Sequence, residues 1–222
     1  MNSAEYVFIS AALLLGVSCS GDRSGLSVPA CGPAPDRLGE NPEYLLVRGL
    51  RDFWSGRTDS TTFYACHDSD SLYLAAYCSD PDIHITEGES ERSVDTSDRI
   101  ELFFAQDDAL SVYYCLEIDP DGKVMDYRAS YYRQFDFDWD CPGISVRGFS
   151  GNGSYSLRVS LSLNRLRELG VLQQDDTMIA GFYRGDYHPS DGSISWYSRL
   201  DPHTPEPDFH VPASLGRLKL AR

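Results

Sequence analysis

The sequence predicts an all-β protein: a single antiparallel β-sandwich, jelly-roll or immunoglobulin-like, with one short helical turn. Apolar and polar residues alternate with a period of two in a series of short runs from Thr61 onward. Turn signals rich in Gly, Asn, Asp and Pro separate these runs at intervals of about 8–15 residues, as in sandwiches and barrels. Aromatic residues make up 12% of the 222 residues, and 14 are tyrosines, a composition that favours strands.

The expected elements follow from these runs in chain order. We predict strands at 61–66, 72–78, 99–105, 112–118, 124–128, 144–149, 155–163, 178–184, 193–197 and 216–220. The sequences DPDG at 119–122 and GNG at 151–153 are strong signals for tight turns between consecutive strands. A helical turn is expected at 164–169, with Asn164 as its N-cap and Gly170 ending it.

Two runs show the alternation most clearly. In 155–163, Tyr, Leu and Val residues at odd positions face inward, and Ser and Arg residues face outward. In 99–105, three apolar residues share one face, whereas Arg99, Glu101 and Phe103 share the other. The second run therefore predicts a strand with a carboxylate on one face.

The charge balance narrows the classes of partner. The chain has 34 acidic and 19 basic side chains, for a net charge of −15. Such a chain repels phosphate at long range, so we expect no nucleic-acid partner. The hydrophobic fraction of 41% and the length indicate one folded domain with its own core.

The N-terminal segment predicts export. An apolar run at 7–17, too short to span a bilayer, precedes small residues and Cys19. This pattern resembles a bacterial lipoprotein signal, which implies lipidation of Cys19; simple secretion is the alternative. We therefore expect a signal peptide at 1–18, a flexible Gly/Ser/Pro-rich tether at 19–42 and the domain at 43–222. The expected location is the outer membrane or cell surface of a Gram-negative bacterium.

The cysteines indicate neither a zinc site nor a dense disulfide framework. Five remain beside Cys19, at irregular spacing and without a CxxC pair. Cys66, Cys78 and Cys115 fall within predicted strands, where a free cysteine is often a small buried apolar residue. A bridge between Cys31 and Cys141 is one open pairing.

Four segments in order resemble family 9 carbohydrate-binding modules and their Bacteroides-type relatives. They are SLYLAAYCSD at 71–80, DRIELF at 98–103, the strand and turn at 155–169, and FHVPASLGRLKL at 209–220. The resemblance covers roughly residues 43–222. It implies a jelly-roll-like sandwich that binds sugar on a concave face or in a loop cleft, often with structural calcium. The family's clamp Trp has no aromatic counterpart at 94–96, and its strand Arg falls near Cys115.

Sugar recognition needs aromatic faces and charged or amide groups for the hydroxyls. We expect Glu101 and Arg184, on adjacent strands, to form a hydroxyl-binding pair; an ordinary ion pair on the sheet is the alternative. Trp139, Phe209 and Trp196 are the candidate platforms. The alternatives are that Trp139 closes one end of the sandwich and that Trp196 packs in the core.

The sequence gives weaker evidence for a metal site than for a sugar site. The five histidines show neither HxH nor HExxH spacing, so the sequence does not predict a zinc site. Asp80 and Asp82 offer hard oxygen ligands for calcium, although turn chemistry alone also explains acidic residues in loops.

The sequence thus predicts a non-catalytic, lipid-anchored module that binds oligo- or polysaccharide, in polysaccharide capture or catabolism. Two alternatives stay open. One is a protein-interaction domain that has lost the sugar clamp and docks a partner lipoprotein or receptor. The other is a glycoside hydrolase using Glu101 and Glu117, for which two carboxyls about 5.5 Å apart are required in a retaining enzyme.

Overall fold

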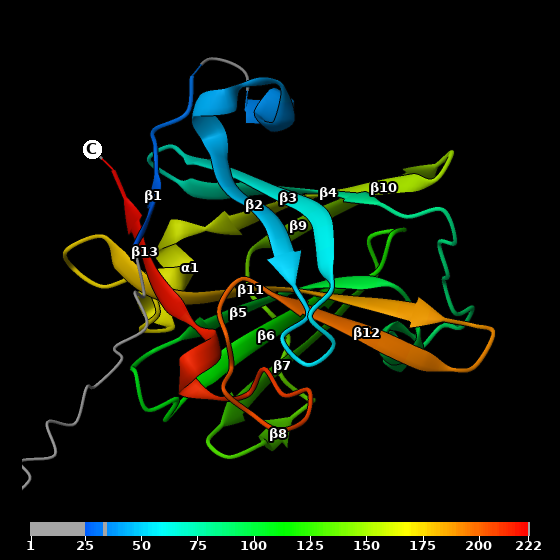
Figure 1. Cartoon of the computed structure of the whole chain (residues 1–222). Coiled ribbons are helices and arrows are strands. Elements are labelled where there is room, and N and C mark those ends of the chain that lie inside the picture. Colours follow the sequence, from blue (N-terminus) through cyan, green and yellow to red (C-terminus); the bar gives the residue numbers. More distant parts are fainter. Residues whose placement is uncertain (1–24, 33–34, 222) are drawn as a thin grey trace, which may run out of the picture.

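The strands form one hydrogen-bonded path that folds over into two packed layers (Figure 1). The computed structural model describes residues 25–32 and 35–221. The strands are β1 (Leu26–Val28), β2 (Leu45–Arg51), β3 (Thr58–His67), β4 (Ser71–Ser79), β5 (Arg99–Ala105), β6 (Tyr113–Ile118), β7 (Val124–Ser130), β8 (Gln134–Asp136), β9 (Ile144–Gly151), β10 (Ser154–Ser162), β11 (Thr177–His188), β12 (Ser193–Ser198) and β13 (Gly216–Leu220). The one α-helix described is α1 (Leu163–Glu168), and 3-10 turns are η1 (Pro35–Glu40), η2 (Pro42–Tyr44), η3 (Glu91–Thr96) and η4 (Pro212–Ser214).

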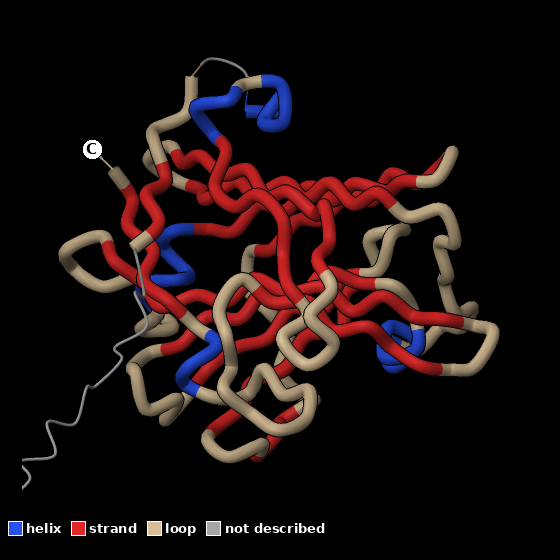
Figure 2. The backbone as a smooth tube through the Cα atoms, in the orientation of Figure 1, coloured by secondary structure: helices blue, strands red, loops and turns tan. Residues whose placement is uncertain are grey.

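The path runs β8-β7-β6-β5-β11-β12-β2-β3-β4-β10-β9. Its two halves join through a single register pair, Ser198 with Arg51, so the path can fold at that point. Neighbouring strands on the path are antiparallel, and helices are few and short (Figure 2). The predicted all-β sandwich is confirmed.

The main core lies between the two layers. Alternation places Ile100, Leu102 and Phe104 of β5 against Leu157 and Val159 of β10 within one apolar cluster. Both runs keep the faces that their sequence predicts, because a period of two leaves only one way to bury the apolar set. Glu101 therefore points to the outer face of its layer, away from this core.

The N-cap of the helical turn lies two residues earlier than expected, and α1 begins one residue earlier, at Leu163. Ser162, not Asn164, is the N-cap: its side chain accepts a hydrogen bond from the amide of Arg165. Asn164 instead donates to Glu168 one turn along. Gly170 has φ +70°, a conformation that favours glycine, and it ends the helix as predicted.

The segment from residue 25 is part of the domain, which corrects the expectation of a tether extending to 42. β1 pairs in parallel with β13, and Val28 is fully buried. Leu38 of η1 is also buried, in a small cluster over β3 and β4. A strand of three residues is too short to show a period. The expected signal peptide, Cys19 and the start of the expected tether lie outside the described residues.

Among the described residues, no helix combines the length and apolar character needed to cross a membrane.

A disulfide joins Cys31 to Cys66, so the open pairing of Cys31 with Cys141 is wrong. The amide of Cys31 donates to the carbonyl of His67, which holds this segment beside the end of β3. Cys66 is therefore not a free strand cysteine, which corrects the expectation. Cys78 and Cys115 are free and buried, as expected, and Cys141 is free and half-buried.

Replacing Cys31 and Cys66 together with alanine should lower the free energy of unfolding by about 2–4 kcal/mol, because the bridge restricts the unfolded chain. Denaturant unfolding with and without reductant measures this. Cys141→Ala is the matched control and should keep the wild-type response to reductant. Equal stability of oxidised and reduced wild-type protein would contradict the prediction.

Candidate binding cavity on the outer sheet face

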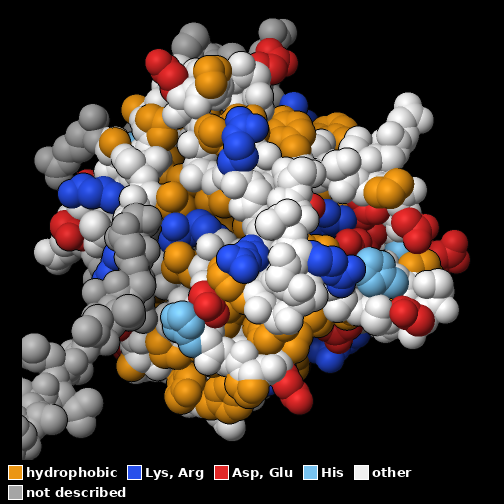
Figure 3. Space-filling view, viewed as in Figure 1, with side chains coloured by type: hydrophobic (Ala, Val, Ile, Leu, Met, Phe, Trp, Pro, Cys, Tyr) orange, Lys and Arg blue, Asp and Glu red, His pale blue; other side chains and the backbone are white. Residues whose placement is uncertain are grey.

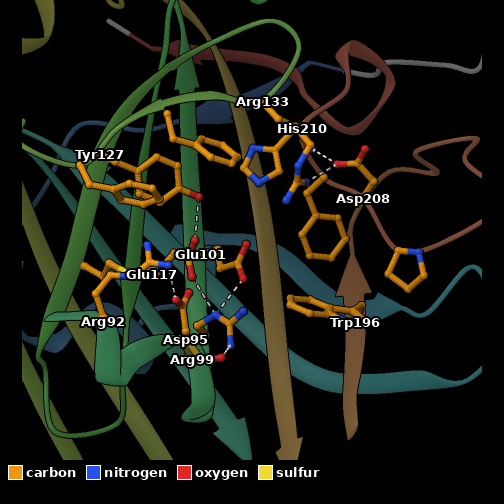
Figure 4. A pocket seen from close by; sticks show the side chains of 15 residues that line it. Arg92, Asp95, Arg99, Glu101, Glu117, Tyr127, Arg133, Trp196, Asp208 and His210 are labelled. Atoms are coloured by element: carbon orange, nitrogen blue, oxygen red, sulfur yellow. Dashed lines mark hydrogen bonds and ion pairs between the residues drawn. The ribbon is translucent and has the colours of Figure 1, made fainter. Parts of the chain in front are cut away.

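A cavity of about 240 Å³ opens on the outer face of the layer that contains β5, β6, β7, β11 and β12 (Figure 4). Charged and aromatic side chains share its walls. The lining residues are Arg92, Asp95, Arg99, Glu101, Glu117, Met125, Tyr127, Arg133, Phe135, Phe137, Trp196, Pro207, Asp208, Phe209 and His210. A second apolar cluster, distinct from the core between the layers, supports this face.

Two buried carboxylates face each other on the cavity floor. Glu101 on β5 is the register partner of Glu117 on β6, and both side chains are almost fully buried. Arg99 Nε lies 3.0 Å from Glu101 Oε1 and 2.8 Å from Glu117 Oε2. The Tyr127 hydroxyl donates to Glu117 Oε1 at 2.7 Å. One guanidinium thus bridges two acids.

This arrangement holds a proton on the acid pair. Burial, followed by the nearby Glu117 carboxylate, raises the pKa of Glu101 to about 8. Burial also raises the pKa of Glu117, against the opposing effect of Arg99. At neutral pH the pair therefore retains a proton, and a carboxylic acid can donate a hydrogen bond as well as accept one.

Gly185 makes room for the bridging guanidinium. It lies between Arg99 and Trp196 in register, on β11. A Cβ at this position would come within 3.2 Å of Arg99 Cζ. Without it, the guanidinium spreads across the strand and lies 4.9 Å from the centroid of a Trp196 ring. The indole therefore forms a wall beside the charged floor.

Further aromatic rings close the cavity opposite the acids. Phe209 stacks on Tyr183 at 4.2 Å between centroids, and Trp196 meets Phe209 edge-on at 5.8 Å. His210 accepts or donates a hydrogen bond at 3.1 Å to the Tyr113 hydroxyl. Burial, followed by Arg133, lowers the pKa of His210 to about 4, so its imidazole is neutral at physiological pH.

Two arginines stand at the rim, each held by a carboxylate and a ring. Arg92 pairs with Asp95 at 2.8 Å and lies 4.3 Å from the Phe137 ring centroid. Arg133 pairs with Asp208 at 3.2 Å, as Figure 4 shows. Phe137 is 43% exposed. In Figure 3, apolar side chains gather at the lower edge of the molecule, around β8 and the neighbouring loops. The mouth of the cavity thus offers exposed ring surface.

The structure brings three of the five predicted sugar-binding residues together: Glu101, Trp196 and Phe209 all line this cavity. Trp139 does not. Its ring packs against Tyr114, 4.8 Å between centroids, at the edge of the core between the layers. This contact favours the alternative in which Trp139 packs on the sandwich and does not form a sugar platform.

Arg184 is not a partner of Glu101, although the two lie on adjacent strands. The register pairs Tyr183 with Glu101 and Arg184 with Ile100, so the two side chains leave opposite faces of the layer. Arg184 is 2% exposed and pairs with Asp59 at 3.0 Å. The expected hydroxyl-binding pair is therefore wrong, and the ion-pair alternative applies with different acids.

The two candidate calcium ligands, Asp80 and Asp82, do not belong to the same acidic cluster. Asp80 lies 2.8 Å from Arg184 Nη2, and one oxygen each of Asp80, Asp98 and Asp186 lie within 4.8 Å of one another. Asp82 is not in this group; its amide donates to Asp80 Oδ1. Burial raises the pKa of Asp98 to about 7.

Several cavity residues carry no local sequence signal. Arg99 shares a face with Glu101 in the alternating run, and this was the only pattern that could have indicated it. Arg133, Asp208 and Phe137 lie in irregular segments brought together by the fold alone. Glu117 was singled out as a possible catalytic partner of Glu101, and the two are indeed neighbours.

Neither a protein-family model nor a curated protein matches the chain. Solved structures do. A protein of Bacteroides uniformis ATCC 8492, provisionally described as carbohydrate-binding, superposes with a TM-score of 0.68 at 16% identity, over 89% of this chain and 100% of that chain. A family 9 carbohydrate-binding module from Caldicellulosiruptor kristjanssonii in complex with glucose gives 0.58 at 14% identity, over 88% and 94%. The same type of module with cellotriose gives 0.57 at 14%, over 88% and 92%. The chain therefore has the fold of family 9 carbohydrate-binding modules, as its sequence motifs indicated.

Proposed function

We propose that this protein binds carbohydrate, without cleaving it, in the cavity above Glu101 and Glu117. The observation that carries the proposal is the meeting of hydrogen-bonding charge and ring faces in one small cavity. Trp196 and Phe137 offer surfaces for the C–H side of a sugar ring, while Arg99 and the two acids offer partners for its hydroxyls. Sugar-binding modules share the fold.

The size and charge of the cavity suit a neutral sugar. Its volume of about 240 Å³ lies near the lower end of ligand pockets, which are about 300–1,000 Å³, so one sugar unit with its neighbour at the mouth is the expected occupant. Each arginine at the cavity, Arg92, Arg99 and Arg133, is already paired with a carboxylate. An anionic group would have to displace one of these pairs.

A glycosidase is not the better interpretation. Glu101 and Glu117 are both almost fully buried and share one guanidinium, so neither is free to act as a solvated nucleophile while the other acts as acid. The matching structures are named for carbohydrate binding.

Trp196→Ala should weaken binding of glucose or cellotriose by at least about tenfold, because a stacking wall is lost. Titration calorimetry on folded protein, with folding verified by circular dichroism, measures this. Trp139→Ala is the matched control and should bind as the wild type does. Glu101→Gln, which preserves side-chain size, should also weaken binding. Unchanged affinity in both Trp196→Ala and Glu101→Gln would contradict the proposed site.

The cellular setting belongs to the same proposal. A lipid on Cys19 would anchor the domain to the outer membrane or cell surface, where it would capture polysaccharide for catabolism. Mass spectrometry of the mature N-terminus tests the lipid. A partner lipoprotein or receptor is the alternative ligand, which a pull-down without glycan binding would favour.

Structural calcium is proposed only at the cluster of Asp80, Asp98 and Asp186, called the Asp80 group below. Three carboxylates are suitable donors for calcium. Arg184 already contacts Asp80 and Asp186, at 2.8 and 3.3 Å. A calcium ion would therefore have to share these acids with the guanidinium.

A further inference from the structure

The outer face of the other layer carries a second group of polar and aromatic residues, remote from the cavity. On β9 and β10 the inward positions are apolar, and the outward positions carry Ser, Arg and Phe. Arg147 on β9 is the direct register partner of Arg158 on β10. The next pair along the same face is Phe149 with Ser156. Strand pairing thus places two guanidinium groups beside an exposed ring.

Among the described side chains, no acid balances the charge of these two arginines. Neither makes an ion pair with any residue in the described part of the chain, 25–32 and 35–221. Like charges directly opposite each other on a sheet are unfavourable. A bound anion would relieve the repulsion.

Cavities lie on both sides of the arginine pair. One, of about 480 Å³, is bordered by Phe149, Tyr77 and several hydroxyl groups. The other, of about 290 Å³, is bordered by both arginines, Tyr73 and two serines. Among the described side chains, neither cavity is bordered by an aspartate or a glutamate.

The exposed ring of Phe149 lies beside the two arginines. Phe149 is 52% exposed, and Arg158 Cζ lies 5.5 Å from its centroid. Stacking on an aromatic face orders a guanidinium and leaves its edge N–H groups free to bind an anion. Ser156 and Ser160 add hydroxyls in the same outward row. Ring faces, hydroxyls and two cations together are the groups that a charged sugar needs.

We propose that this face is a second carbohydrate site, selective for acidic polysaccharide. Arg147 and Arg158 bind one carboxylate or sulfate of the polymer, and Phe149 contacts the neighbouring sugar ring. This site is separate from the neutral-sugar cavity, since the two lie on the outer faces of different layers. The net charge of −15 opposes the long-range approach of any polyanion, so binding depends on short-range contacts with Arg147 and Arg158, inside the screening length of about 8 Å at physiological ionic strength.

The test is affinity electrophoresis of the full-length protein in gels containing polygalacturonate, chondroitin sulfate or neutral β-glucan. Arg147→Gln/Arg158→Gln should weaken binding to at least one acidic polymer by about tenfold or more, since two charge-assisted contacts are lost. Arg165→Gln/Arg217→Gln removes the same charge from exposed arginines elsewhere and should bind as the wild type does. Retardation by the acidic polymer should also decrease with added salt. Polygalacturonate carries carboxylates only, whereas chondroitin sulfate carries both carboxylates and sulfates, so retardation by chondroitin sulfate alone would indicate that the sulfate is needed.

Three results would overturn the proposal: no retardation of the wild type by either acidic polymer, equal retardation of the Arg147/Arg158 variant, or equal loss in the Arg165/Arg217 control. These results leave the cavity proposal untouched, because that proposal is tested with neutral glucose and cellotriose. Retention of neutral-sugar binding in the Arg147/Arg158 variant also shows that the variant is folded.

Discussion

Replacing Arg99 with methionine should lower the free energy of unfolding by about 3–5 kcal/mol at pH 8. The change removes the guanidinium that lies within 3.0 Å of both Glu101 and Glu117 and leaves two buried acids facing each other. Removing one partner of a buried ionic group costs this much, because the remaining charge has neither water nor a counter-ion. Denaturant unfolding of wild type and variant at the same pH measures the difference.

The free energy of unfolding should also depend on pH through Glu101 and Glu117. The pKa of Glu101 is about 8 in the folded protein and near 4.5 in the unfolded chain, so the folded state holds the proton more tightly. Stability from this group is complete below about pH 4.5 and is lost as pH rises through about 8. The Arg99→Met defect should accordingly shrink at pH 5, because Glu101 is then protonated in the folded protein and burial raises the pKa of Glu117 as well.

Two variants complete this test. Arg99→Met combined with Glu117→Gln should recover much of the lost stability, because only one buried acid remains. Arg217→Met, which breaks an exposed pair with Asp108, should cost no more than about 1 kcal/mol. An Arg99→Met protein as stable as the wild type at pH 8 would mean that the buried bridge is not needed for folding.

The sequence predicts those features of the structure that depend on local patterns within one strand. The run 99–105 places Glu101 on the outer face by alternation alone, and the structure keeps that face. The same reasoning failed for Arg184, because alternation assigns faces within a strand but not between strands. Only the register, with Arg184 opposite Ile100, shows that it leaves the other face of the layer.

The rest of the cavity could not be predicted for a different reason. Its rim comes from η3, from the segment around β8 and from the segment before η4, which are far apart in sequence and have no period. Their side chains meet only after β5, β6 and β7 have paired. Trp139 shows the reverse case: it is a candidate platform for sugar in the sequence, but in the structure its indole packs against Tyr114.

Replacing Arg184 with methionine should cost a similar 3–5 kcal/mol without weakening sugar binding in the cavity. Its guanidinium lies 3.0, 2.8 and 3.3 Å from Asp59, Asp80 and Asp186, and the side chain is 2% exposed. Losing it leaves several buried acids crowded together with no cation.

The two readouts separate structure from recognition. Because Arg184 leaves the face of β11 opposite Glu101, the affinity for cellotriose, measured well below the melting temperature, should match the wild type. A folded Arg184→Met protein that no longer binds sugar would restore Arg184 to the binding site.

Calcium binding at Asp80, Asp98 and Asp186 is tested by thermal unfolding. If these three acids hold the ion, the melting temperature rises with calcium and falls with chelator. That rise should be larger at pH 8 than at pH 6, because the pKa of Asp98 is about 7 and its proton competes with the ion.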